Sequence, residues 1–260
     1  MSFVENVVFV HGWGLNKAVW GDYIEAFMSR FPNLNVHNID IPGYGDQAHV
    51  DSTANLEELA RACLEQAPKN AVWVGWSLGG MITMQAALLG VENNNQQIQA
   101  MQLINSTPKF VQSDDWVCGV DIEIFRKFSA DLARDYSKTL STFLLLQAGA
   151  SRGARQLARD AQEAISRYDN PSEVTLSKGI DCLAMSDLRN QLKLLTQPSQ
   201  VVLGKLDRVT KPDSSLNLAA LLGADLVEVS SGHAPFMTHE AEMLNAFEVL
   251  LNKVEQGLVS

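Results

Sequence analysis

The sequence lacks several features that mark other classes of protein. Its 260 residues include only three cysteines, an odd number without the spacing of a metal site. No apolar run reaches the ~18 residues of a membrane span, and no basic segment followed by a long apolar stretch stands at the N-terminus. The net charge of −10 disfavours nucleic acid as a partner. We therefore expect a cytoplasmic monomer with reduced thiols, no metal, no cofactor, no nucleic acid and no membrane contact.

Short apolar runs alternate with helical patterns along most of the chain, which predicts a mostly parallel sheet flanked by helices. Between 109 and 190 the pattern is helical throughout. We therefore expect a helical cap, 109–190, inserted into an α/β core formed by 1–108 and 191–260. The cap would lie over the carboxyl ends of the strands, where open α/β sheets bind ligands. Strands are expected at 7–10, 34–39, 71–75, 98–104, 200–204 and 225–229.

One short motif indicates the chemistry. Gly75-Trp76-Ser77-Leu78-Gly79 has the form G-x-S-x-G and lies between an apolar run and a helix-compatible run. A serine held on a sharp strand-to-helix turn exposes its hydroxyl, and glycine two positions before and after it avoids collision with the neighbouring chain. Ser77 is therefore the predicted nucleophile of an acyl-transfer enzyme.

A serine hydroxyl needs a base that accepts its proton and an acid that orients the base. The strand, turn and helix around Ser77 resemble those of α/β-hydrolases, in which both groups follow the serine in the chain. Only His233 and His239 lie downstream. His233 is the predicted base because it follows an expected strand, whereas His239 falls at the start of the final helix.

Asp207 is the predicted acid, because it lies in the loop that follows the expected strand 200–204. Three other carboxylates are weaker candidates, because two lie in helix-like polar stretches and one precedes a strand: Asp181, Asp187 and Asp225. Some relatives of this fold place the acid one strand earlier. There the chain reads Asn105-Ser106-Thr107-Pro108, without a carboxylate.

Two backbone amides are expected to stabilise the oxyanion that forms during acyl transfer. One belongs to Leu78, next to the nucleophile. The other belongs to Trp13, in the glycine-flanked turn His11-Gly12-Trp13-Gly14 after the first strand. His11 precedes the serine, so we expect it to brace this loop.

A stripe of arginines lies in the expected cap. Arg152, Arg155 and Arg159 are three and four residues apart, which places them on one face of a helix. Such a stripe is either an ordinary solvated face or a docking surface for an acidic partner. The sequence alone leaves both interpretations open.

Together these motifs resemble the pimeloyl-[acyl-carrier protein] methyl ester esterases of biotin synthesis. The resemblance covers most of the chain and implies a serine esterase of the α/β-hydrolase fold with the triad Ser77, Asp207 and His233. It rests on five segments: His11 to Asn16, Gly75 to Gly80, Phe143 to Gln147, Asp187 to Arg189, and His233 to Phe236 with His239.

The same resemblance implies how substrate and carrier bind. Acyl carrier protein would dock on basic residues of the cap, namely Lys138, Arg152, Arg155 and Arg159. Substrate contacts would come from Trp13, Ser77, Leu78, Phe143, Leu144, Leu145, Leu146, Gln147 and His233. Three alternatives stay open at this point: a general carboxylesterase, a carbon–carbon bond hydrolase or lyase of the same fold, and a ligand receptor that keeps the triad but turns over very slowly.

Overall fold

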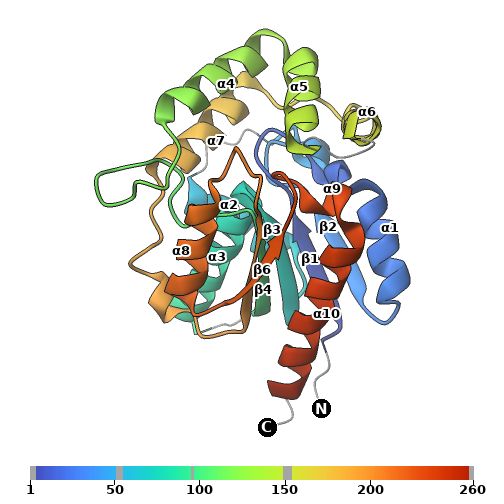
Figure 1. Ribbon diagram of the computed structural model, residues 1–260, viewed down its shortest axis with the longest axis vertical. Helices are drawn as coiled ribbons and strands as arrows, with labels where there is room; N and C mark the ends of the chain where they lie inside the picture. The colour runs from blue at the N-terminus through green and yellow to red at the C-terminus, as the bar shows by residue number, and fades with distance from the viewer. Residues whose placement is uncertain (1–3, 51–54, 95–96, 149–153, 258–260) are drawn as a thin grey trace.

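The computed structural model describes residues 4–50, 55–94, 97–148 and 154–257 (Figure 1). A six-stranded sheet forms its centre, with the strand order β2-β1-β3-β4-β5-β6 and parallel pairing throughout. This sheet confirms the predicted fold class. The strands are β1 (Asn6–Val10), β2 (Asn35–Ile39), β3 (Ala71–Trp76), β4 (Ile98–Ile104), β5 (Ser199–Gly204) and β6 (Asp225–Val229).

Helices cover both faces of the sheet, so its central strands are apolar on both sides, as parallel strands buried between two layers must be. Along β1, Val8 and Val10 pack against one layer, and Val7 and Phe9 against the other. Figure 1 shows α1 and α10 on one side and α2, α3 and α8 on the other. These helices are α1 (Gly21–Arg30), α2 (Leu56–Gln66), α3 (Leu78–Glu92), α8 (Pro212–Leu222) and α10 (Glu240–Gly257).

Four further helices lie between β4 and β5 in the chain and stand above the rest of the molecule in Figure 1. We call these four the cap helices, and two of them are hydrogen-bonded to the segment after β1. Trp13 Nε1 donates to the Leu176 carbonyl at 3.1 Å, and the Tyr136 hydroxyl donates to the Gly14 carbonyl at 3.0 Å. The cap helices are α4 (Ile122–Arg134), α5 (Tyr136–Ala148), α6 (Ala154–Ile165) and α7 (Glu173–Met185).

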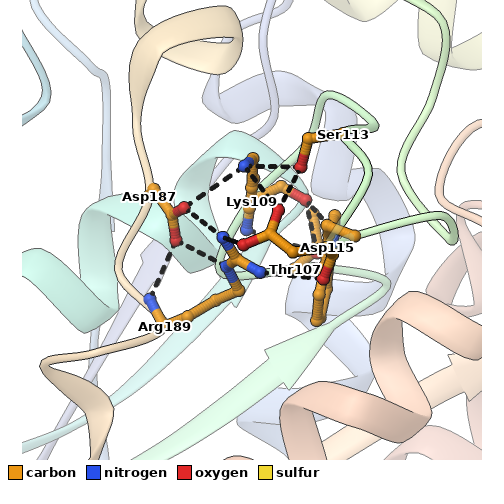
Figure 2. Close-up of polar contacts among 7 residues, drawn as sticks. Thr107, Lys109, Ser113, Asp115, Asp187 and Arg189 are labelled. Atoms are coloured by element: carbon orange, nitrogen blue, oxygen red, sulfur yellow. Dashed lines mark hydrogen bonds and ion pairs between the residues drawn. The ribbon is translucent and has the colours of Figure 1, made fainter.

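A cluster of charged side chains joins the two segments that connect the cap helices to the core (Figure 2). Lys109 and Asp115 come from the segment after β4, whereas Asp187 and Arg189 come from the segment before β5. Arg189 lies 2.7 Å from Asp187 and 2.8 Å from Asp115, and Lys109 lies 3.3 Å from Asp187. We call these four residues the ionic cluster. It connects the segment that follows β4 with the segment that precedes β5, at the base of the cap helices.

Candidate active site

Ser77 lies at the sharp turn between β3 and α3. Its backbone has φ 56° and ψ −118°, a strained conformation for a residue that carries a side chain. The flanking glycines permit this turn. A Cβ on Gly75 would lie 2.5 Å from the Gly79 carbonyl oxygen, and a Cβ on Gly79 would lie 2.2 Å from the Val10 carbonyl oxygen. The glycine spacing of the motif thus follows from how closely the turn packs against its neighbours.

Asp207 and His233 come together from the loops that follow β5 and β6. The Asp207 Oδ2 and His233 Nδ1 atoms are 2.7 Å apart, and both side chains are buried. The other carboxylate oxygen, Oδ1, accepts the backbone N–H groups of Val209 at 2.7 Å and Thr210 at 3.1 Å. These donors fix the plane of the carboxylate, so one oxygen stays directed at the imidazole.

The His233 ring also lies beside the serine turn. Its centroid is 5.4 Å from that of Trp76, the residue immediately before Ser77, and Trp76 Nε1 donates to the His233 carbonyl at 2.8 Å. Within the described part of the chain, the Ser77 hydroxyl makes no hydrogen bond. The hydrogen bond between Ser77 and His233 therefore stays a prediction, as the triad does. Catalytic hydrogen bonds often tighten only once substrate is bound.

The rival acids and the rival base lie in other surroundings. Asp181 pairs with Lys178, Asp225 pairs with Lys253, and Asp187 belongs to the ionic cluster. His239 Nδ1 lies 2.7 Å from the Thr238 hydroxyl, next to it in the chain. None of these contacts involves Ser77 or the loops that carry Asp207 and His233.

His11 has the surroundings of a bracing residue. Its ring is fully buried; Nε2 accepts the Ile41 N–H at 3.1 Å, and Nδ1 lies 2.8 Å from the Gly12 carbonyl oxygen. This pattern needs one protonated and one unprotonated nitrogen, which is the neutral imidazole. Burial, the largest influence, lowers the pKa of His11 and favours the same form.

The amides of Trp13 and Leu78 are candidates for the oxyanion site. Leu78 is the first residue of α3, so its N–H has no acceptor within the helix. Trp13 lies in the turn after β1, where Gly14 takes φ 76°. Neither amide donates a hydrogen bond to any residue that the structure describes. Both are thus available to an oxygen bound beside Ser77.

A cavity of about 510 Å³ opens above Ser77, between the core and the cap helices. Its walls are largely apolar, because they include Trp13, Phe110, Phe128, Phe143 and Leu183. Phe128 lies between two other rings, with centroids 5.4 Å from Trp13 and 4.5 Å from Phe143. Charged residues also line it: Asp131, Arg134, Asp135, Lys138 and Arg208. Ser77 therefore faces a largely apolar cavity that is also lined by charged side chains.

The segment expected to contact substrate forms part of α5. Phe143 lines the cavity. Leu144 is fully buried, in the same apolar cluster as Val7 and Phe9, and Leu145 is exposed. The side chains of Leu146 and Gln147 lie outside the described part of the structure.

The residues expected to dock a carrier lie on α5 and α6. Lys138 is exposed and lines the cavity. Arg155 and Arg159 are exposed on α6, and Arg159 donates to the Gln156 side chain at 2.8 Å. Arg152 lies outside the described residues. Carrier docking at these positions stays a prediction.

The site has the features of a hydrolase, and comparison with known proteins assigns the family. Residues 7–246 match the model of the alpha/beta hydrolase family. The chain belongs to this family. A pimeloyl-[acyl-carrier protein] methyl ester esterase of Vibrio cholerae is 37% identical over 240 residues, which cover 92% of this chain and 90% of that protein. Proteins of the same name from Citrobacter koseri and Xanthomonas campestris are 34% and 35% identical, covering 96% and 94% of this chain and 94% and 95% of theirs.

Solved structures of alpha/beta hydrolases have the same fold. An esterase from Exiguobacterium antarcticum superimposes with a TM-score of 0.82 at 19% identity, covering 97% of this chain and 93% of that one. A bromoperoxidase from Bacillus anthracis does so with a TM-score of 0.81 at 18% identity, covering 96% and 93%. At these identities the likeness shows the fold alone. The family resemblance inferred from the sequence is confirmed by the relatives and the family model together.

Two further observations concern other kinds of site. Among the residues that the structure describes, no helix is long and apolar enough to cross a membrane. Within those same residues, no group of three or more His, Cys, Asp or Glu side chains could hold a metal ion.

Proposed function

We propose that the protein is a serine carboxylesterase that hydrolyses the methyl ester of pimeloyl-[acyl-carrier protein] methyl ester, releasing methanol and pimeloyl-acyl carrier protein. The 2.7 Å contact between Asp207 and His233, beside a strained serine that faces an apolar cavity, carries the proposal. The names of the relatives support the choice of substrate. The enzyme would act as a monomer in the cytoplasm.

In the first half of the reaction, His233 takes the Ser77 proton while Oγ attacks the ester carbonyl carbon. The Trp13 and Leu78 amides hold the resulting oxyanion, and each such donor is worth on the order of 3 kcal/mol of transition-state stabilisation. The ionised Asp207 stabilises the imidazolium. As the tetrahedral intermediate collapses, the imidazolium gives its proton to the departing methoxide, and methanol leaves an acyl-enzyme.

In the second half, His233 takes a proton from water, and the hydroxide attacks the acyl-enzyme carbonyl. The imidazolium then returns the proton to Ser77 Oγ, which leaves as the hydroxyl. The product is a carboxylic acid where the methyl ester stood, and it ionises to the carboxylate by releasing its proton to solvent. This group is charged and strongly hydrated, so the apolar cavity favours its release.

The cavity fits a long, apolar acyl group. Burial of each methylene contributes about 0.8 kcal/mol, and the aromatic walls from Trp13, Phe128 and Phe143 supply the surface for it. The methyl ester would lie at Ser77 and the thioester would stay outside, towards the carrier. Positive charge at Lys138, Arg155 and Arg159 would attract an acidic carrier to a chain whose own net charge is −10.

Turnover of the carrier-linked substrate tests the proposal. The purified protein should release methanol from pimeloyl-acyl carrier protein methyl ester, and the gene should restore biotin-independent growth to a strain that lacks the esterase. Ser77→Ala should abolish both activities and also the hydrolysis of a p-nitrophenyl ester. Undiminished turnover by Ser77→Ala would end the nucleophile assignment.

Charge reversal separates a carrier-dependent esterase from a general one. The double variant Arg155→Glu/Arg159→Glu should lower kcat/KM for the carrier-linked ester by roughly tenfold and leave the p-nitrophenyl ester unaffected. Arg61→Glu is the matched control, because Arg61 is an exposed arginine on α2 that pairs with Glu57. Equal activity of the double variant and the wild type on the carrier-linked ester would favour a general carboxylesterase.

A further inference from the structure

Asn105 lies between the loop that carries Asp207 and the loop that carries His233. Its sequence context did not reveal this position. It follows β4 directly and is almost completely buried. Its backbone N–H donates to the Val202 carbonyl of β5 at 2.8 Å. Its side chain therefore lies at the carboxyl ends of the central strands, where both loops begin.

The Asn105 amide uses both of its donors and its acceptor. Nδ2 donates to the Gly232 carbonyl at 3.0 Å and to the His233 carbonyl at 2.7 Å. Oδ1 accepts the Gly204 N–H at 2.7 Å. The Gly204 carbonyl in turn accepts the Asp207 N–H at 3.1 Å. One side chain thus connects the turn that carries the acid with the loop that carries the base.

The backbone conformation of Asn105 restricts the residues that could replace it. Its φ is 42°, in the left-handed region, which asparagine, aspartate and glycine adopt more readily than other residues. Of these three, only asparagine provides two donors and an acceptor at the end of a short side chain. Backbone conformation and hydrogen bonding therefore select the same residue.

The next residue extends this connection to the nucleophile. The Ser106 hydroxyl donates to the Ser77 carbonyl at 2.8 Å, and the Ser77 N–H donates to the Ile104 carbonyl at 3.0 Å. The end of β4 thus contacts the segments that carry all three residues of the proposed triad.

We propose that Asn105 is a positioning residue of the hydrolase, which sets the placement of the His233 loop relative to the Asp207 turn through its buried amide. It does not line the cavity, so it acts through His233 and not on the substrate. The inference rests on the proposed function of the triad.

The variant Asn105→Asp removes the two donors and keeps an acceptor, but it also adds a carboxylate, whereas Asn105→Gly removes the amide without adding charge. Aspartate has nearly the same shape, tolerates the left-handed backbone and can still accept the Gly204 N–H. It cannot make both donations to the His233 loop. We expect kcat for a p-nitrophenyl ester to fall by about 10- to 100-fold, because small misplacements of catalytic groups cost this much. KM should change by less than about twofold, because no cavity contact is lost.

A spectroscopic measurement separates positioning from general destabilisation. The proton between His233 Nδ1 and Asp207 should give a downfield NMR resonance, assigned by its loss in His233→Gln. This resonance should shift or vanish in Asn105→Asp. Asn105→Gly, which keeps the backbone conformation and removes the whole amide, should behave similarly and provides a second variant if the aspartate variant does not fold.

Two control variants complete the test. Gln102→Met removes another buried amide of β4, which donates to Gln200 of β5 at 2.8 Å, and should lower the melting temperature while leaving kcat and the resonance unchanged. Asn70→Asp makes the same chemical change at an exposed left-handed asparagine and should alter nothing.

The outcomes distinguish this inference from the proposed function. A wild-type kcat and an unchanged resonance in Asn105→Asp and Asn105→Gly would overturn the positioning role, as would an equal loss of kcat in Gln102→Met. Either result would leave the esterase itself intact. A wild-type protein that hydrolyses no ester would instead overturn the proposed function.

Discussion

The floor of the cavity and its cap are held in place by different kinds of interaction. At the floor, the His233 carbonyl accepts buried hydrogen bonds from Trp76 and Asn105, and Asp207 accepts two backbone amides. On the cap helices the ion pairs are exposed, as in the pair between Arg134 and Asp131, where the arginine side chain is 80% exposed. The ionic cluster at the base of the cap lies between these extremes, with Arg189 and Lys109 each 18% exposed.

This difference indicates which part of the molecule fixes the chemistry and which part can vary. Buried hydrogen bonds in a low-dielectric interior are strong and directional, and salt does not screen them. Exposed ion pairs contribute about 0–1 kcal/mol each and weaken as salt rises. The floor can therefore hold the reacting groups in one geometry, while the cap walls can change with little effect on that geometry. Changes at the floor should alter kcat, whereas changes in the cap should alter KM or stability.

Asp207→Asn should have the largest effect among these predictions. The amide would hold His233 less well and would leave the imidazolium without its counter-charge, so we expect kcat to fall on the order of 10⁴-fold. Steady-state hydrolysis of a p-nitrophenyl ester measures the loss. Asp225→Asn makes the same change at an exposed carboxylate that pairs with Lys253 and should keep wild-type kcat. A larger loss in Asp225→Asn than in Asp207→Asn would reassign the acid.

Phe143→Ala should have a smaller effect, of another kind. It removes an aromatic wall of the cavity that packs against Phe128, so KM for a long-chain p-nitrophenyl ester should rise by about tenfold. The acetate ester, which is too short to reach this wall, should be hydrolysed with unchanged KM. Leu145→Ala is the matched control on the same helix, because Leu145 is 40% exposed and does not line the cavity. Equal changes in both variants would show that α5 acts through its stability alone.

The sheet could be predicted from the sequence because each strand is a short run with a simple burial rule. The ends of all six expected strands lie within one residue of those observed. Local turn geometry was harder to predict. Between β1 and β2 the chain forms a 3₁₀ turn, Lys17–Trp20, before α1, and Gly21 at the junction has φ 46°. The final helix, α10, is preceded by the short helix α9 (Pro235–Thr238).

Some residues of the site could also be predicted from the sequence, and others could not. The motif indicates the nucleophile, and chain order indicates its partners, because each of these residues directly follows a strand that the sequence predicts. The role of Asn105 depends on residues 99 to 128 positions away in the chain. The sequence therefore showed only that no carboxylate stands at this strand end. Family resemblance indicated the segment from Phe143 to Gln147 as a unit. A helix presents only one face to a cavity, which is why Phe143 lines it and Leu145 does not.

Arg189→Met tests the ionic cluster, whose exposure lies between that of the buried hydrogen bonds at the floor and that of the exposed ion pairs on the cap helices. The change removes the contacts to Asp115 and Asp187 and leaves both carboxylates with fewer partners. We expect a loss of free energy of unfolding on the order of 1 kcal/mol and a melting temperature about 2–4 °C lower. High salt should reduce the difference from wild type. Arg126→Met, which breaks an exposed pair with Glu123, should change the melting temperature less. A kcat lowered as much as in Asp207→Asn would show that the cluster also orders the floor.

Acid titration should give the smallest effect. Hydrogen bonds from Ser113 and then Arg189 lower the pKa of Asp115 to about 2, below its ordinary value of ~3.9. The unfolded chain therefore binds this proton first as the pH falls, so the stabilisation is complete above pH ~5 and is lost progressively as the pH falls to about 2. Asp115→Asn removes the titrating group, so its free energy of unfolding should lie below that of wild type by a constant amount above pH ~5 and approach it below pH ~4. Urea unfolding of the wild type and of Asp115→Asn across this range measures both curves. A constant gap down to pH 2 would show that the charge of Asp115 contributes nothing to the cluster.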